Sequence, residues 1–163
     1  MWSLGFGISC VATRAISRVT TREQLSRSCE TIEQAYEFML AYAAQGLAGD
    51  AGSQSGGQLR EFLTRAVSAL NGLAAGYAAH VDAERLQPRD RYDAFLQVLG
   101  RDAADSIAAI ELVLAQPSIG SQTVANLNAS IHVRALLTDL FLIDEILRAP
   151  AVETGRANSS PES

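Results

Sequence analysis

The stretch NLNASIHVRALLTDLFLIDEILR, residues 126–148, decides the fold of this chain. It begins with hydrogen-bonding side chains, including Asn128 and His132, and then becomes almost wholly apolar as far as the pair Asp144 and Glu145. The apolar residues recur at three- and four-residue steps, which is the period of an α-helix. The stretch therefore predicts a helix with a polar beginning and an unusually apolar remainder.

Apolar residues surround this helix on more than one side. One set consists of Val133, Leu136, Leu137, Leu140, Phe141, Ile143 and Leu147, and another consists of Ile131, Ala135, Leu142 and Ile146. A helix that is apolar on most sides is buried on most sides, whereas each helix of a four-helix monomer normally keeps one face exposed to solvent. The surplus could be covered by the N-terminal arm, by a partner chain or by a second copy. We expect a homodimer whose interface is the first set.

The rest of the chain continues the helical pattern. Helices are expected over about 28–46, 57–85, 92–114 and 121–148. The pair Asn71 and Gly72 could interrupt the second helix, but the apolar period keeps its phase across the pair, so one continuous helix is expected. Short connections after the second and third helices indicate antiparallel neighbours. The sequence thus predicts an all-α, antiparallel up-down four-helix bundle over 23–149, followed by a disordered tail over 150–163.

Charge and cysteine content exclude several classes of protein. The net charge is −5, and the cations, all of them Arg, do not gather into a patch, so nucleic acid is not an expected partner. A chain rich in Ala and Arg that lacks Lys indicates a GC-rich bacterial genome. The longest apolar run, 133–147, is too short and too often interrupted by charge to span a membrane. Cys10 and Cys29 form neither a disulfide framework nor a zinc signature, so no metal or cofactor is expected.

The first 22 residues differ from the rest because they contain no acidic residue. Arg14, Arg18 and Arg22 recur at every fourth position. An acid-poor start that carries Arg, Ser and Thr resembles an organellar transit peptide. The other interpretation is a loosely ordered N-terminal arm on a cytoplasmic protein. We expect the arm and the cytoplasm, with an organelle as the alternative if this segment is a transit peptide.

The polar residues of the C-terminal helix form a candidate ligand site. Asn128, His132 and Asp139 share one helical face because they are separated by four and seven residues. Such a stripe could line an interhelical pocket, with Glu111 and an aromatic side chain such as Tyr77 nearby. The same residues could instead form ordinary buried hydrogen bonds that fix the helix register. No residue is predicted to be catalytic, since no nucleophile, base or paired carboxylate stands in a recognisable arrangement.

These observations favour a non-enzymatic protein that acts through protein contacts. It would be an accessory, assembly or adaptor subunit that self-associates through its fourth helix and binds a protein partner that the sequence does not identify. The alternative is a small-molecule binding protein or enzyme with a polar pocket around Asn128, His132 and Asp139. Fold class alone does not decide between them, because helical bundles have many unrelated functions.

Overall fold

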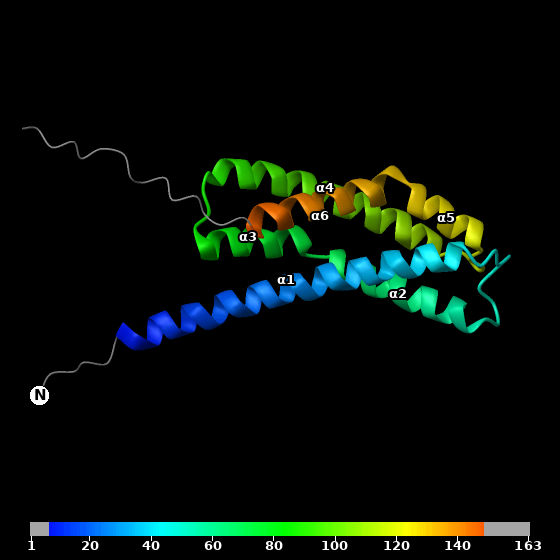
Figure 1. Cartoon of the computed structure of the whole chain (residues 1–163), viewed down its shortest axis with the longest axis horizontal. Helices are drawn as coiled ribbons and strands as arrows, with labels where there is room; N and C mark the ends of the chain where they lie inside the picture. Colours follow the sequence, from blue (N-terminus) through cyan, green and yellow to red (C-terminus); the bar gives the residue numbers. More distant parts are fainter. Residues whose placement is uncertain (1–6, 149–163) are drawn as a thin grey trace, which may run out of the picture.

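The computed structural model describes the backbone of residues 7–148 and the side chains of residues 21–148. This part of the chain is helical with no strand, so the all-α class is confirmed, but it forms six helices rather than four (Figure 1). They are α1 (Gly7–Ala43), α2 (Gln54–Leu70), α3 (Leu73–Glu84), α4 (Arg89–Leu114), α5 (Ser121–Ala129) and α6 (Ile131–Arg148). The predicted tail over 150–163 lies outside the described residues. The first helix already begins at Gly7, within the segment predicted to be a loose arm.

The predicted continuous helix over 57–85 is wrong because the chain breaks at residues 71 and 72. Asn71 has an extended backbone, and Gly72 takes a φ of 83°, in the left-handed region that glycine occupies without strain. Leu70, Leu73 and Tyr77 are nevertheless all buried on the two sides of the break. The apolar phase therefore survives the break, which is why the sequence pattern alone indicated one helix.

A second break divides the predicted C-terminal helix at Ser130. The backbone of Ser130 is extended, with a ψ of 142°, and its Oγ accepts a hydrogen bond of 3.4 Å from the amide of Val133. A serine hydroxyl at this position caps the first turn of the next helix. Asn128 therefore belongs to α5 while His132 belongs to α6, and the single polar face predicted for 126–148 is interrupted.

The helices pack around a single core. The long helix α1 packs against α2, α3 and α5, while α4 packs against α2, α3 and α6 (Figure 1). Tyr42 and Tyr77 are the largest fully buried side chains, and the Tyr42 hydroxyl donates a 2.8 Å hydrogen bond to the Ile119 carbonyl. A buried phenol with its hydroxyl satisfied adds apolar area without leaving a polar group unpaired.

Asp50 joins two loops at one end of the molecule. Its side chain is nearly inaccessible; one carboxylate oxygen accepts a 2.7 Å hydrogen bond from the Ile119 amide, and the other lies 2.5 Å from Arg60 Nε. The Arg60 guanidinium also donates to the carbonyls of Leu114 and Gln116 at 3.0 and 2.9 Å. The loop after α1 is thus fixed to the start of α2 and to the connection between α4 and α5.

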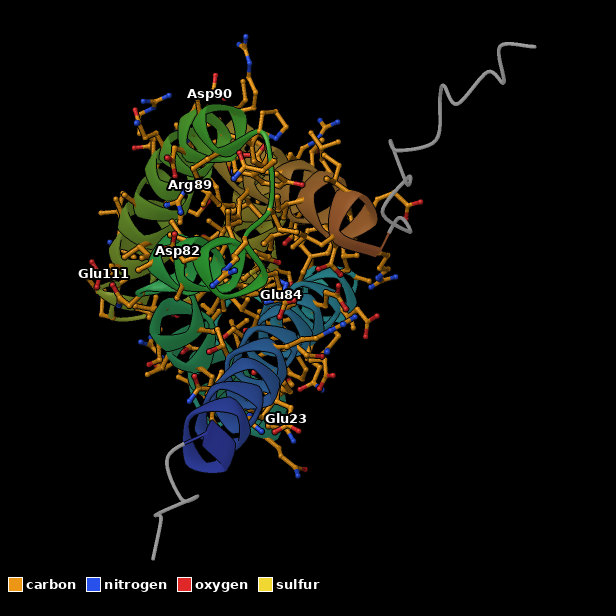
Figure 2. The ribbon with its side chains drawn as sticks, turned by 90° about the vertical axis from the view of Figure 1, so that its left-hand side faces the viewer. Glu23, Asp82, Glu84, Arg89, Asp90 and Glu111 are labelled. Carbon is orange, nitrogen blue, oxygen red and sulfur yellow. The ribbon has the colours of Figure 1, made fainter. Side chains whose placement is uncertain are left out.

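Ion pairs hold the opposite end, where α3 turns into α4. Arg89 at the start of α4 pairs with Asp82 of α3, and its Nε lies 2.7 Å from Asp93 Oδ1 one turn further along α4 (Figure 2). All three side chains are more than a third exposed, so these pairs orient the turn more than they stabilise it.

Candidate functional site

The helix α6 carries two separate apolar stripes, and only one of them faces the core. Its buried side chains are Val133, Leu136, Leu137, Leu140 and Ile143. These five were predicted as part of an interface, but they pack inside the chain and present no surface to a partner. Of the other predicted interface residues, Phe141 is 62% exposed and Leu147 is partly buried against the core. The candidate contact surface therefore lies on the other side of the helix.

We call that other side the outer face of α6; it consists of Ile131, Ala135, Thr138, Leu142 and Ile146. At 100° per residue these positions form one stripe opposite the buried one. Ile131 is 76% exposed, Leu142 is 49% exposed and Ile146 is 45% exposed. Phe141 lies beside the stripe. Scattered exposed apolar residues are normal on a protein surface, but an aligned row on one helix is typical of a contact surface.

A groove and a hollow border the outer face. The groove has a volume of about 280 Å³, and its lining consists of Pro88, Arg91, Tyr92, Phe95, Ile143 and Ile146. It is almost wholly apolar and lies between the start of α4 and the C-terminal half of α6. The hollow has a volume of about 590 Å³, and its lining consists of Ala129, Ile131, Arg134, Ala135, Thr138 and Asp139. It lies over the N-terminal half of α6, where small side chains leave space.

The structure does not gather the predicted polar site residues into one arrangement. Asn128 is buried on α5, and neither its amide oxygen nor its nitrogen has a hydrogen-bond partner in the described part of the chain. His132 is exposed on α6, where its Nδ1 lies 3.7 Å from Asp105 Oδ2 of α4. Glu111 is exposed on the outer side of α4, away from α6 (Figure 2). Each of these three residues thus has different surroundings.

Asp139 faces a second carboxyl group, that of Asp102 on α4. Burial, together with the hydrogen bond and the charge of Asp102, raises the pKa of Asp139 to about 6. Two carboxyl groups in contact hold a proton between them because both cannot ionise without repulsion. The seam between α4 and α6 therefore carries an acidic pair that is protonated in mildly acidic solution.

A hydrogen-bonded cluster that the sequence did not indicate lies between α1, α3 and α6. Cys29 Sγ lies 3.3 Å from Tyr77 Oη, which donates to Asp144 Oδ1 at 3.4 Å. Asp144 Oδ2 in turn accepts a 2.7 Å hydrogen bond from Arg148. The cluster borders a cavity of about 230 Å³ that His80 also lines. No local spacing could have revealed it, because its members come from three helices far apart in the sequence.

The electrostatics of this cluster do not favour nucleophilic chemistry. Burial raises the pKa of the Cys29 thiol, and burial likewise raises the pKa of Tyr77. The thiolate is the reactive form of cysteine, so a raised pKa lowers reactivity. Burial lowers the pKa of His80, which keeps that side chain neutral rather than a cation able to activate the thiol. The cluster therefore acts as a link between helices.

Other classes of site are not indicated within the described residues. No three His, Cys, Asp or Glu side chains among residues 21–148 stand close enough to hold a metal ion. None of the helices within 7–148 combines the length and apolar character that a membrane crossing requires. Comparison with protein-family models, with curated proteins and with solved structures finds no match to this chain.

Proposed function

We propose that this chain is a non-enzymatic helical protein that acts through protein–protein contacts and self-associates through the outer face of α6. In this proposal it is an accessory, assembly or adaptor subunit of the cytoplasm. In this proposal the scaffold is an up-down four-helix bundle in which two of the four helices are interrupted, one at Gly72 and the other at Ser130. The observation that supports the proposal is the row formed by Ile131, Leu142 and Ile146 on the side of α6 opposite the core.

The exposed area supports a dimer of moderate affinity. Full burial of a large apolar side chain contributes about 1.5–3 kcal/mol, so burying the exposed half to three quarters of one contributes about 1.3 kcal/mol. Ile131, Phe141, Leu142 and Ile146 of two copies, about half exposed or more, would give roughly 10 kcal/mol. Loss of translational and rotational freedom costs at least about 4 kcal/mol. The difference, at most about 6 kcal/mol, corresponds to a dissociation constant of tens of micromolar or weaker.

Sedimentation equilibrium of the full chain over about 5–500 µM tests the proposal. We expect a monomer–dimer equilibrium, and we expect Leu142→Glu to leave a monomer because it places a charge in the centre of the contact. Leu112→Glu on α4 is the matched control, since Leu112 is also an exposed leucine, at 67%, but lies on another helix and lines neither the groove nor the hollow. A wild-type chain that stays monomeric over the whole range would refute self-association, as would unchanged dimerisation of Leu142→Glu.

A further inference from the structure

The outer face of α6 has a protrusion and a recess in each half. In the N-terminal half Ile131 protrudes and the hollow over Ala135 is the recess. In the C-terminal half Leu142 protrudes, and the groove beside Ile146 is the recess. At a rise of 1.5 Å per residue, Ile131 and Ile146 lie about 22 Å apart along the helix axis.

We propose that the occupant of this face is a second copy of the chain, whose α6 packs antiparallel on the first about a two-fold axis near Thr138. This inference rests on the proposed self-association and adds its geometry. In such a pair, residues face each other when their numbers have a constant sum. The arrangement that places Ile131 opposite Ile146 also places Ala135 opposite Leu142. Leu142 of one copy then faces the hollow over Ala135 of the other, Ile131 faces Ile146 at the edge of the groove, and the symmetry repeats both contacts.

The charges beside the outer face match the same arrangement. Arg134 and Glu145 lie on one flank of the stripe, are exposed, and form no ion pair within the described part of the chain. A two-fold axis perpendicular to antiparallel helices brings like flanks together. Arg134 of each copy then lies within about 3 Å, measured along the axis, of Glu145 of the other copy. Two ion pairs across the interface would result, one on each side of the symmetry axis.

A parallel pair lacks this complementarity. In a parallel pair, Leu142 of one copy would face Leu142 of the other, and the two hollows over Ala135 would face each other. Protrusions would then meet protrusions. The parallel pair would also bring Arg134 toward Asp139 of the second copy. The carboxyl group of Asp139 is already engaged with Asp102 of its own chain, and its Oδ2 atom is buried. Glu145 would have no cation opposite it.

Charge reversal tests the pairing of the flanks. Arg134→Glu and Glu145→Arg are each expected to raise the dissociation constant about tenfold, because each places like charges opposite each other twice. The double variant restores both pairs with their signs exchanged, and its affinity is expected to return close to wild type. Double-variant affinity no better than that of the single variants would overturn the proposed pairing.

Cysteine cross-linking tests the orientation independently, in a chain with Cys10→Ser and Cys29→Ala. A disulfide needs Cα atoms within about 7 Å of each other. The antiparallel pair allows Ala135→Cys to bridge to Leu142→Cys, whereas two copies of residue 135 lie about 10 Å apart along the axis. We expect covalent dimers from the doubly substituted chain and none from Ala135→Cys alone.

The outcomes separate this inference from the proposed function. Cross-linking of Ala135→Cys alone would show a parallel pair and overturn the antiparallel arrangement while leaving self-association intact. Dimers that neither variant cross-links would show a different contact surface and would also overturn it. A wild-type chain that sediments as a monomer would remove both proposals together.

Discussion

Replacing Asp50 with Ala is expected to destabilise the monomer by about 3 kcal/mol. The side chain of Asp50 is only 6% exposed, and its carboxylate accepts hydrogen bonds from the Ile119 amide and from Arg60. Loss of the first bond leaves a buried amide without a partner, which costs about 1–3 kcal/mol. Loss of the second contributes about 1 kcal/mol, since Arg60 is 35% exposed and regains solvent. The two contributions together give the expected magnitude.

Urea unfolding followed by circular dichroism measures this loss. The experiment is done at about 1 µM and pH 7, where the monomer predominates, so that association does not enter the result. Asp90→Ala is the control, because Asp90 is 73% exposed and its partner at 3.5 Å, Arg91, is 82% exposed. Since Asp90 lies in the first turn of α4, where a carboxylate interacts favourably with the helix dipole, we expect that control to cost less than about 1 kcal/mol. A loss below about 1 kcal/mol in Asp50→Ala would refute the view that this carboxylate joins the two loops.

The hydrogen bonds of the Asp50 carboxylate also predict how the destabilisation by Asp50→Ala depends on pH. The hydrogen bond from Arg60, followed by that from the Ile119 amide, holds the pKa of Asp50 below its usual range. A carboxyl group whose pKa is lowered by folding contributes stability above its unfolded pKa of about 3.9 and loses that contribution as the pH falls through the folded value. The difference between wild type and Asp50→Ala should therefore be constant from pH 5 to 8 and should shrink at pH 3.

Two further predictions concern the start of α2 and the seam between α4 and α6. Gly56→Ala would place a Cβ atom 2.2 Å from the Asp50 carbonyl oxygen and is expected to destabilise the chain by about 2 kcal/mol. The Cβ atom of Gly57→Ala would meet nothing within 4 Å, so this variant should stabilise the helix by up to about 1 kcal/mol. Thermal unfolding of the two variants measures the contrast. Because the pKa of Asp139 is raised to about 6, ionisation above that pH costs stability, and Asp139→Asn should stabilise the chain by about 1 kcal/mol at pH 7.5. The gain should disappear near pH 4, and equal effects at the two pH values would contradict the proton shared with Asp102.

Periodicity predicted the two apolar stripes of the C-terminal helix but not which one the core would cover. The pattern separates Ile131, Ala135, Leu142 and Ile146 from the remaining apolar positions, and the structure keeps that separation except at Phe141, which is exposed. The choice between the stripes depends on where the other helices lie, and a repeat along one helix does not contain that information. The sequence therefore indicated a surplus of apolar surface correctly, while the residues named for the interface were mostly those of the core.

The breaks at Gly72 and Ser130 could not be inferred from hydrophobic spacing. The breaks involve only two non-helical residues, Asn71 and Gly72, in the first case and one, Ser130, in the second, and the buried apolar residues on both sides stay on the core side. Glycine and serine occur within helices at modest cost, so their presence alone does not end one. The consequence at Ser130 is larger, because it removes Asn128 from the helical face that carries His132 and Asp139.

The contacts between residues far apart in the sequence could not be predicted from hydrophobic spacing either. The cluster of Cys29, Tyr77 and Asp144 joins residues separated by 48 and 67 positions, and Asp50 reaches Ile119 across 69 positions. Polar contacts of this kind depend on the relative placement of whole helices and loops. Local propensity and spacing describe each helix by itself, so they indicate which residues are buried but not which buried polar groups meet.

The buried stripe of α6 stabilises the monomer, and the outer face of the same helix is a separate surface. Leu136 and Ile143 are almost fully buried, and with their neighbours they hold α6 against α4 without help from any other chain. The fold therefore has no need of large apolar side chains at Leu142 or Ile146, where polar residues would satisfy the same helix and be better hydrated. An apolar row that contributes little to the monomer can stabilise only a state in which something covers it. Because that row has recesses beside it and a pair of opposite charges on its flank, a second copy of α6 is the occupant that we propose.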